Sequence, residues 1–372
     1  MPLEQEICEA HSARSTSFVS RQVNASTFLI IEDDKYGEQP HIYVKIYSNH
    51  LLINDTGCNA PRRKKLAITS LRHYLETYPM PCYNKQILNP KGKKGYIIIC
   101  SHCHYDHILG IPQFLSADPI IVASSFDKAF ILEDLPIHSL CTYIDLPTPK
   151  YEISYWARQF DTPQLETELP LRIQFLQIPG HTPCSLAWYD IDEHHLYVGD
   201  AFYERKRAIP IPELPDDVGQ IPGLPATQAA IIFPQEGGNW IQYMESLDLL
   251  ISFTRHQNEK LRRQYKYEHD HEHEHHRRSQ AAKENIVPLP IPRVLVSCGH
   301  LTISADAEKM LDEVNTLFWR IINGKVPVTS SGTKRGVIYD LWVESEDDSK
   351  YSVMAPRCLV EEARKHFNRH LN

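Results

Sequence analysis

The chain has 372 residues, of which 42% are hydrophobic, with a formal net charge of −8 and nine cysteines. This length and apolar content are enough to bury a large core, while the odd number of unpaired-looking cysteines argues against a disulfide framework and favours a reducing compartment. The acidic balance argues against a nucleic-acid partner, because binding a phosphate backbone needs a basic surface.

The N-terminus has no basic region followed by an apolar one, and no stretch approaches the roughly 20 apolar residues of a membrane span. We therefore expect a cytoplasmic protein that does not contact a membrane. A short basic run at residues 62–65 is interpreted as the solvated start of a helix that continues through residues 66–78.

A dense group of candidate ligands follows the apolar, strand-like residues 96–100. His102 and His104 are two residues apart, so an extended loop can turn both toward one metal ion. Asp106 and His107 come directly after and can reach a second ion. A solvated polar loop is the alternative interpretation, but four potential ligands in this order favour a metal site.

Three more strand patterns end in a candidate ligand. His181 follows the apolar run 173–178, and Asp200 and His300 each close a short apolar run of their own. A single His or Asp after a strand is more typical of a cap or turn residue. As a series they predict that the ends of these strands converge at one edge of a sheet assembly.

The order of these residues resembles the metallo-β-lactamase superfamily, whose signature is an HxHxDH motif followed by a distant His, an Asp and a final His. Asp55, in the run Asn-Asp-Thr-Gly, matches a structural aspartate behind the site in that family. The resemblance covers roughly residues 18–205 and 290–325. It implies an α+β fold, the αβ/βα four-layer sandwich, with two mixed β-sheets flanked by helices and metals at one edge.

The resemblance also implies a ligand set, residue by residue. One ion would lie on His102, His104 and His181, a second on Asp106, His107 and His300, and Asp200 would bridge them. Zn²⁺ fits such nitrogen and carboxylate ligands, with Fe or Mn as alternatives. An aspartate at the bridging position is similar to the glyoxalase II and lactonase branches, whereas antibiotic-degrading members carry other residues there.

Two ions about 3.5–4 Å apart can activate water and polarise a carbonyl, so hydrolysis of an ester, thioester or amide is the expected reaction. Asp106 and Tyr203 are the candidate catalytic residues. Tyr203 stands three residues after Asp200, a spacing that resembles quorum-quenching lactonases, and a phenol can donate a hydrogen bond to the substrate carbonyl or leaving group. A tyrosine packed at the start of a loop is the alternative.

The leading expectation is a dinuclear hydrolase that opens a small cyclic ester, carbamate or amide. A thioester hydrolase of the glyoxalase II or carrier-protein type is the first alternative, and the absence of a dense basic cluster in this acidic chain weighs against it. An iron-dependent oxidoreductase on the same fold is the second. We expect a small-molecule substrate and leave open whether the chain forms a homodimer.

A single domain is expected over residues 1–372, with an insertion at about 206–290 and a C-terminal extension at about 337–372. In the insertion, five prolines between residues 209 and 225 predict an extended loop near the substrate. Asn239 predicts the N-cap of a helix with an apolar stripe. Residues 268–276 alternate His with acidic residues and predict a mobile linker, with weak metal capture as the alternative.

After His300, Ser304 is expected to cap a helix that ends at Asn323, followed by a strand at residues 337–343 and a last helix from Leu359. Four cysteines stand beside candidate site residues, and we interpret them as small apolar fillers rather than redox or ligand groups. These are Cys58, Cys103, Cys184 and Cys298.

Overall fold

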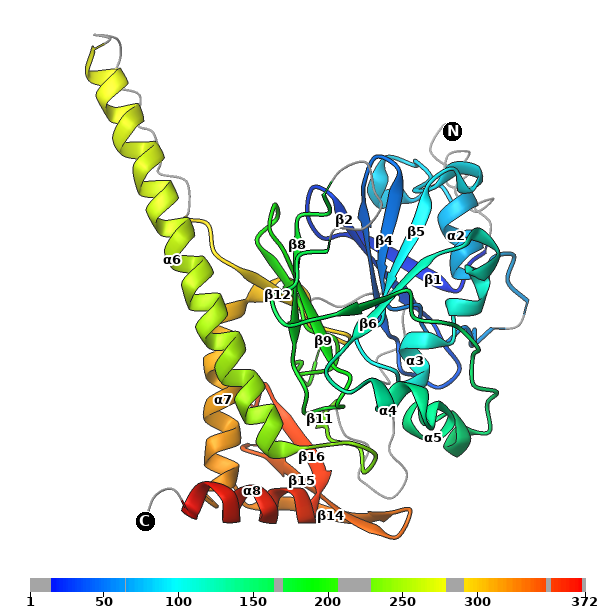
Figure 1. Ribbon diagram of the computed structural model, residues 1–372, viewed down its shortest axis with the longest axis vertical. Coiled ribbons are helices and arrows are strands. Elements are labelled where there is room, and N and C mark those ends of the chain that lie inside the picture. The colour runs from blue at the N-terminus through cyan, green and yellow to red at the C-terminus, as the bar shows by residue number, and fades with distance from the viewer. Residues whose placement is uncertain are drawn as a thin grey trace, which may run out of the picture.

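The computed structural model describes residues 15–63, 65–163, 170–206, 229–278, 291–345 and 349–369. Within these ranges the strands form three sheets (Figure 1). The first has seven strands in chain order, antiparallel from β1 to β4 and parallel from β4 to β7. Its strands are β1 Phe18–Gln22, β2 Thr27–Glu32, β3 His41–Ile46, β4 His50–Asn54, β5 Gly95–Ile99, β6 Ile120–Ser124 and β7 Tyr155–Ala157.

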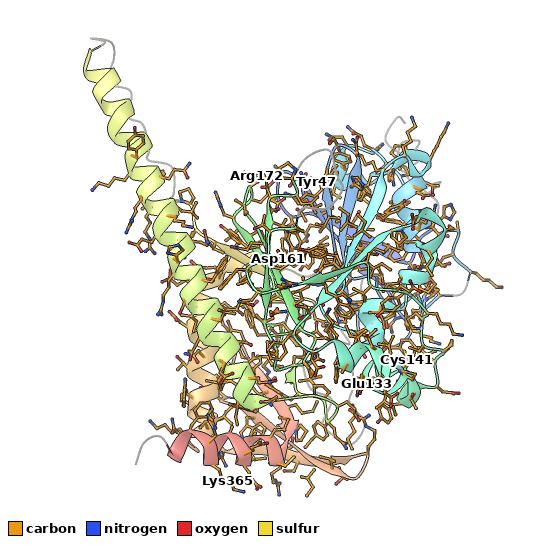
Figure 2. The ribbon with its side chains drawn as sticks, viewed as in Figure 1. Tyr47, Glu133, Cys141, Asp161, Arg172 and Lys365 are labelled. Atoms are coloured by element: carbon orange, nitrogen blue, oxygen red, sulfur yellow. The ribbon has the colours of Figure 1, made fainter. Side chains whose placement is uncertain are left out.

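The second sheet has five strands in the order β13-β12-β10-β9-β8, and it is also mixed, because β10 and β12 are parallel while the other pairs are antiparallel. Its strands are β8 Ile173–Gln177, β9 Leu186–Asp190, β10 His195–Tyr197, β12 Leu295–Ser297 and β13 Ala305–Asp306. The sheets are joined by side-chain contacts, and at one end the hydroxyl of Tyr47 donates to the carbonyl of Leu171 at 2.5 Å. Figure 2 labels Tyr47 beside Arg172 at this end.

A third sheet of four strands, in the order β11-β16-β15-β14, was not predicted as a separate sheet. It contains the predicted strand at residues 337–343, which is β15, and it joins the C-terminal extension to a strand near residue 231. Its strands are β11 Ile231–Ile232, β14 Val328–Lys334, β15 Val337–Val343 and β16 Ser352–Pro356.

Side chains along the strands of the first sheet alternate between its two faces, and each face packs against a different layer of the fold. Leu29 and Ile31 pack in a cluster with residues of the second sheet, among them Trp188. Their neighbours Phe28 and Ile30 face the other way and pack with the helical segments that follow β4. Because successive side chains of a strand point to opposite faces, one strand serves two cores.

The outer face of the second sheet is covered by two helices. Leu176 and Leu196 of this sheet share a cluster with Met244 and Leu247 of helix α6 and with Val314 of helix α7. Helices therefore lie outside both sheets, and the expected α+β four-layer sandwich with two mixed sheets is confirmed. The helices are α2 Leu71–Thr77, α3 Tyr105–Ile108, α4 Lys128–Leu132, α5 Leu135–His138, α6 Trp240–Arg278, α7 Ala307–Ile322 and α8 Arg357–Arg369, with short 3₁₀ turns η1 Pro81–Tyr83, η2 Pro90–Gly92, η3 Ile111–Gln113, η4 Leu115–Ala117 and η5 Cys141–Ile144.

Helix α6 confirms its predicted start and corrects its predicted end. The Asn239 side chain accepts a hydrogen bond from the backbone N–H of Gln242 at 3.0 Å, as an N-cap should. The backbone remains helical to Arg278, so residues 268–276 belong to a helix rather than to an irregular linker. Glu, Arg and Lys have good helix propensity, which lets the helix run beyond the body of the protein, as Figure 1 shows.

Other predicted helix starts were wrong by a few residues. Helix α2 begins at Leu71, where Ser70 accepts from the N–H of His73, so the helix does not extend back to residues 66–70. Helix α7 is capped by Asp306, not by Ser304, because strand β13 occupies the residues up to Asp306. Its predicted end at Asn323 is confirmed. Helix α8 begins two residues earlier than expected.

The C-terminal extension packs into the same core as the second sheet, with Trp342, Val353 and Val360 in the cluster that contains α7. The cysteines of the described residues are all free, and the four beside the site are buried. In the described part of the chain, no helix has the length and apolar character needed to cross a membrane. The predicted proline-rich loop at residues 209–225 lies outside the described residues.

Candidate metal centre

The predicted ligands lie at the ends of strands β5, β8, β10 and β12, and the fold brings these ends together. The parallel pairing of β10 with β12 places the residues after both strands at the same edge of the second sheet. The loop after β5, which belongs to the first sheet, leads into α3 and brings the other four predicted ligands to the same place. All seven predicted ligands are buried and meet in two groups, whose potential ligand atoms lie within 4.8 Å of one another. The first group is His102, His104 and His181, and the second is Asp106, His107, Asp200 and His300.

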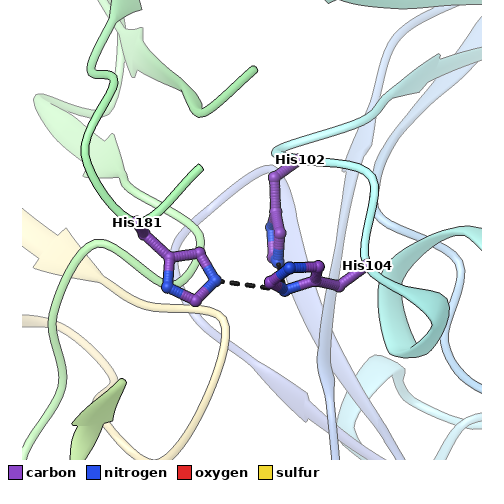
Figure 3. Close-up of side chains that lie close together, drawn as sticks. All are labelled: His102, His104 and His181. Carbon is purple, nitrogen blue, oxygen red and sulfur yellow. Dashed lines mark hydrogen bonds between the residues drawn. The ribbon is translucent and has the colours of Figure 1, made fainter. Parts of the chain in front are cut away.

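The first group presents three imidazole nitrogens to one point (Figure 3). His102 Nε2 lies 2.9 Å and His181 Nε2 lies 3.1 Å from His104 Nδ1. Tetrahedral Zn²⁺ with Zn–N bonds of about 2.0–2.1 Å separates its nitrogen ligands by about 3.3 Å. The three nitrogens are thus close to the spacing that one tetrahedral ion requires.

The second group combines two carboxylates with two imidazoles. Asp106 Oδ2 lies 3.1 Å from His107 Nε2 and 3.3 Å from His300 Nε2. Asp200 Oδ1 lies 3.4 Å from His107 Nε2, and Asp200 Oδ2 lies 3.2 Å from His300 Nε2. Asp200 Oδ2 also comes within 4.0 Å of His102 Nε2 in the first group, so this carboxylate is next to both groups.

Outer partners hold the second ring nitrogen of four of these histidines. His102 Nδ1 contacts Ser101 Oγ at 3.1 Å, and His107 Nδ1 contacts Asp55 Oδ2 at 3.0 Å. His181 Nδ1 lies 2.7 Å from the carbonyl of Ile232, and His300 Nδ1 lies 2.9 Å from the carbonyl of Glu38. A carbonyl or carboxylate that accepts the proton of one ring nitrogen leaves the lone pair of the other available to a metal.

Asp55 has the structural position that the resemblance implied. Besides the contact to His107, its Oδ1 accepts the backbone N–H of Ser101 at 2.8 Å, which fixes the start of the ligand loop. Asp55 is fully buried and has a φ of 63°, a left-handed conformation that Asp and Asn adopt more readily than other residues apart from glycine.

Unsatisfied buried atoms test whether this site fits a cation. Within the described residues, His104 Nε2, His107 Nε2 and Asp200 Oδ1 are buried and make no hydrogen bond. Buried polar atoms normally have a partner, and those of His107 and Asp200 lie in the second group. The residues present, with lone pairs and carboxylate oxygens facing inward, fit a pair of divalent ions.

The charges in the site favour the same conclusion. Burial, with the neighbouring histidines, holds the pKa of His102 well below its usual value, and burial lowers the pKa of His104 to about 3. Burial opposes the charged form of His107 and His300, but the carboxylates of Asp106 and Asp200 outweigh it and raise the pKa of both rings. The histidines of the first group are therefore neutral. The two buried carboxylates of the second group are stabilised by nearby positive charge, which a divalent ion would supply.

Close packing at the strand ends requires glycine at two positions. A Cβ on Gly299 would lie 2.1 Å from Asp200 Oδ1, and one on Gly180 would lie 2.5 Å from the Cα of Tyr243. Gly180 also has a φ of 147°. These glycines let the loops that carry His300 and His181 approach the site closely.

The structure adds residues that the sequence analysis missed. Glu38, from the loop between β2 and β3, accepts a hydrogen bond from the hydroxyl of Tyr105, which lies between His104 and Asp106. Burial raises the pKa of Glu38 to about 7, with a further contribution from Asp106. In the sequence, Glu38 follows several other acidic residues, and nothing distinguishes it from them. Its contact with His300 is made by a backbone carbonyl, which every residue has, so the residue type could not predict it.

The C-terminal sheet supports the first ligand group. Ile232, whose carbonyl contacts His181, belongs to strand β11, and β11 pairs with β16. The next residue, Phe233, donates its N–H to the carbonyl of Met354 at 2.9 Å. The C-terminal extension, whose role the sequence left open, therefore helps to position one of the predicted ligands.

Tyr203 lies beside the site, but its hydroxyl has another partner. Its ring packs edge-on against that of His300, with 5.5 Å between centroids. Its hydroxyl donates to the carbonyl of Ala230 at 2.7 Å, and burial raises its pKa well above the usual value, so it is a neutral phenol. Its predicted contact with a substrate remains a prediction.

Comparison with known proteins gives one curated relative and many solved structures. The relative is a protein of Aspergillus versicolor with the name "Putative transcription factor avaE", 36% identical over 197 residues. The match covers 52% of this chain and 59% of that protein, so it spans about three-fifths of the relative's length.

Among solved structures, ST1585 from Sulfolobus tokodaii, a metallo-beta-lactamase superfamily protein, is 14% identical with a TM-score of 0.42, covering 78% of this chain and 85% of its own. The metallo-beta-lactamase family protein TTHA1429 from Thermus thermophilus is 14% identical with a TM-score of 0.45, covering 84% of this chain and 86% of its own. The family model of the metallo-beta-lactamase superfamily matches residues 37–256, more than half of the chain. The protein therefore belongs to the metallo-beta-lactamase superfamily.

Proposed function

We propose that the protein is a dinuclear hydrolase that binds two Zn²⁺ ions and opens a small cyclic ester, carbamate or amide. The observation that carries this proposal is the position of Asp200. Its Oδ2 lies 3.2 Å from His300 Nε2 and 4.0 Å from His102 Nε2, so one carboxylate reaches both ligand groups. A carboxylate in this position would help to hold two ions, which together supply the chemistry of two-metal hydrolysis.

In this proposal the ions lie on the two groups described above. When bound, they supply a Lewis acid for the substrate carbonyl and a lowered pKa for the attacking water. Zn²⁺ suits the first group because its three ligands are neutral imidazoles at tetrahedral spacing, and it accepts carboxylates in the second.

The side chains of the chain then orient the reactants. Asp106 is the proposed acceptor of a hydrogen bond from the attacking water, because its Oδ2 lies inside the second group, 3.1 Å from His107 Nε2 and 3.3 Å from His300 Nε2. Tyr203 is the proposed donor to the substrate carbonyl or leaving group. Its proton is engaged with the Ala230 carbonyl at 2.7 Å, so this role requires the hydroxyl to exchange one acceptor for another.

Two features of the chain support the choice of a small ring-opening substrate. An aspartate at the bridging position resembles the lactonase and glyoxalase II branches, and Tyr203 has the spacing of lactone-opening members. A small-molecule substrate and a cytoplasmic location are part of the proposal, the latter supported by the free cysteines. The name of the Aspergillus versicolor relative contains the words "transcription factor", but the formal net charge of −8 of the present chain gives nucleic-acid binding no support.

The test is a mass-spectrometric screen of metal-loaded protein against lactones, cyclic carbamates, lactams and thioesters, scored by addition of one water. Metal content is measured on the same preparation by elemental analysis. Preferential ring opening with two Zn²⁺ per chain is the expected result. His195→Ala is a control variant for the same screen and should behave as the native protein does. It removes a buried histidine that contacts Ser297 and belongs to neither ligand group.

The other outcomes are informative. Cleavage of thioesters alone would replace ring opening with a thioester hydrolase. Iron in the protein without hydrolysis of any substrate would contradict the proposal and favour an oxidoreductase on this fold.

A further inference from the structure

The second ligand group takes its members from segments that are distant in the sequence. Asp106 and His107 belong to helix α3, whereas His300 follows strand β12. Tyr105 also belongs to α3, and its buried hydroxyl group donates to the side chain of Glu38 in the loop between β2 and β3. We propose that Tyr105 is a positioning residue for this group, because it joins the ligand helix to the loop that orients His300.

The loop between β2 and β3 contacts the His300 segment at two backbone positions. The carbonyl of Glu38 lies 2.9 Å from His300 Nδ1, and the N–H of His41 donates to the carbonyl of Gly299 at 2.8 Å. When Nδ1 gives its proton to this carbonyl, Nε2 keeps its lone pair for a metal. Nε2 is the atom that faces Asp106 Oδ2, at 3.3 Å. The place of one backbone carbonyl therefore sets where the ring of His300 points.

That carbonyl is held in a backbone conformation that the chain does not favour. It belongs to the peptide group that joins Glu38 to Gln39, and Gln39 has a φ of 49°, in the left-handed region. Residues other than Gly, Asn and Asp seldom adopt this region, so their neighbours must hold them there. Relaxation of Gln39 to a negative φ would rotate the peptide group and move the carbonyl of Glu38 away from His300.

Two side chains hold the loop in place. The carboxylate of Asp34 accepts backbone N–H groups of its own loop, from Tyr36 at 2.8 Å and from Gln39 at 2.7 Å. These bonds stabilise the loop internally. Tyr105 connects it to the ligand helix, because its hydroxyl bonds to the side chain of Glu38 and its ring packs edge-on against that of Tyr36, with 5.6 Å between centroids.

Removal of the Tyr105 hydroxyl should therefore act on one ion and not on the other. The outer partners of the first group come from other segments, since His181 Nδ1 contacts the carbonyl of Ile232. Outer partners commonly change metal affinity by about 10–100-fold, and Tyr105 acts through Glu38, so the lower end of this range is expected. The two ions are those of the proposed function, on which this part of the inference rests; the support of the loop does not depend on it.

The test measures the affinity of the full-length protein for each of two Zn²⁺ ions by competition with a chromophoric chelator. His181→Ala and His300→Ala each delete a ligand of one group and so assign the two affinities. Tyr105→Phe should weaken binding of the second ion about tenfold and leave that of the first unchanged. The matched control is Tyr74→Phe, which should change neither. Tyr74 is buried, its hydroxyl donates to Ser20 Oγ at 2.9 Å, and it belongs to neither ligand group.

Two substitutions of Glu38 separate its hydrogen bond from its charge. Glu38→Gln removes the charge but keeps an oxygen that can accept the hydroxyl of Tyr105, so the second ion should bind as it does in the native protein. Glu38→Ala removes the acceptor and should weaken the second ion as Tyr105→Phe does. Hydrogen exchange on the metal-free proteins adds a readout without metal. Peptides that cover residues 34–41 should exchange faster in Tyr105→Phe and Glu38→Ala, but not in Tyr74→Phe.

Three outcomes would overturn the positioning role. These are an unchanged affinity for the second ion in Tyr105→Phe, an equal loss of affinity for both ions, and a loss in Glu38→Gln as large as in Glu38→Ala, which would assign the effect to charge. Failure of the proposed function is a different result. Absence of hydrolysis together with a selective loss of the second ion in Tyr105→Phe would contradict the proposed function and support the positioning role.

Discussion

Asp55 Oδ2 lies 3.0 Å from Nδ1 of His107, and both side chains are buried behind the metal centre. Asp55 belongs to neither ligand group, but it fixes which nitrogen of His107 faces the second group. Outer-shell partners of this kind commonly change metal affinity by a factor of about 10–100 when they are replaced.

We expect Asp55→Asn to weaken binding of the second metal ion by roughly 10–100-fold, because an amide N–H would face His107 Nδ1 in place of an oxygen. Asparagine tolerates the φ of 63°, so the fold should be retained. Competition with a chromophoric chelator measures the affinity. The matched control is Asp118→Asn, an exposed aspartate with a φ of 50°; an unchanged affinity in Asp55→Asn would remove this positioning role.

Asp200→Ala should lower the metal content from two ions toward one per chain and reduce turnover on the order of 10³-fold or more, since it removes the carboxylate next to both groups. Elemental analysis and the hydrolysis assay measure these effects. Asp192→Ala is the control, because Asp192 pairs with Arg172 at an exposed position. Full activity of Asp200→Ala with a single ion would contradict the dinuclear proposal.

Tyr203→Phe separates two roles of one hydroxyl. If the hydroxyl acts on the substrate, the rate of the chemical step should fall roughly 10²-fold with little change in metal content. If it serves only the Ala230 carbonyl, stability should fall by about 1 kcal/mol and the rate should not change.

Tyr243→Phe is a matched control for this experiment. Tyr243 is likewise buried, and its hydroxyl donates to the carbonyl of Ala201 at 2.6 Å. Both variants should lose similar stability on denaturant unfolding. Equal rates for Tyr203→Phe, Tyr243→Phe and the native protein would remove Tyr203 from the mechanism.

Glu32 gives a prediction for pH. Burial raises its pKa from 4.5 to about 8, although it accepts hydrogen bonds from Asn59 and Ala60. At a pH between these two pKa values, Glu32 holds a proton in the folded protein and has released it in the unfolded chain. The stability contributed by Glu32 is therefore fully present below pH 4.5 and is lost as the pH rises to about 8.

We expect native protein to lose stability relative to Glu32→Gln by about 1.4 kcal/mol per pH unit within this window. Urea unfolding of both proteins at about pH 5 and about pH 8 measures the effect, and taking the difference removes groups that titrate in both. A difference that is the same at the two pH values would show that Glu32 is ionised in the folded protein throughout.

Much of the candidate site can be predicted from the sequence because its chemistry depends on side-chain type. Imidazoles and carboxylates at the ends of apolar runs, as at His181 and His300, predict metal ligands from the sequence alone. The strands that hold them were predicted for the same reason, since runs of apolar and β-branched residues favour buried extended structure. The N-cap of α6 was predicted for a similar reason, because Asn239 is the one good cap candidate at that position.

Other features depended on contacts between distant segments. Ile232 and Glu38 hold ligand histidines through backbone carbonyls, which every residue has, so no residue type could identify them. Ser304 and Asp306 are both good caps, and only the pairing of β13 with β12 decided between them. The sequence by itself determined the family, the candidate ligands and the strands that carry them. The tertiary structure decided the outer partners of the histidines and the third sheet, because these depend on which distant segments come into contact and not on the residue types within each segment.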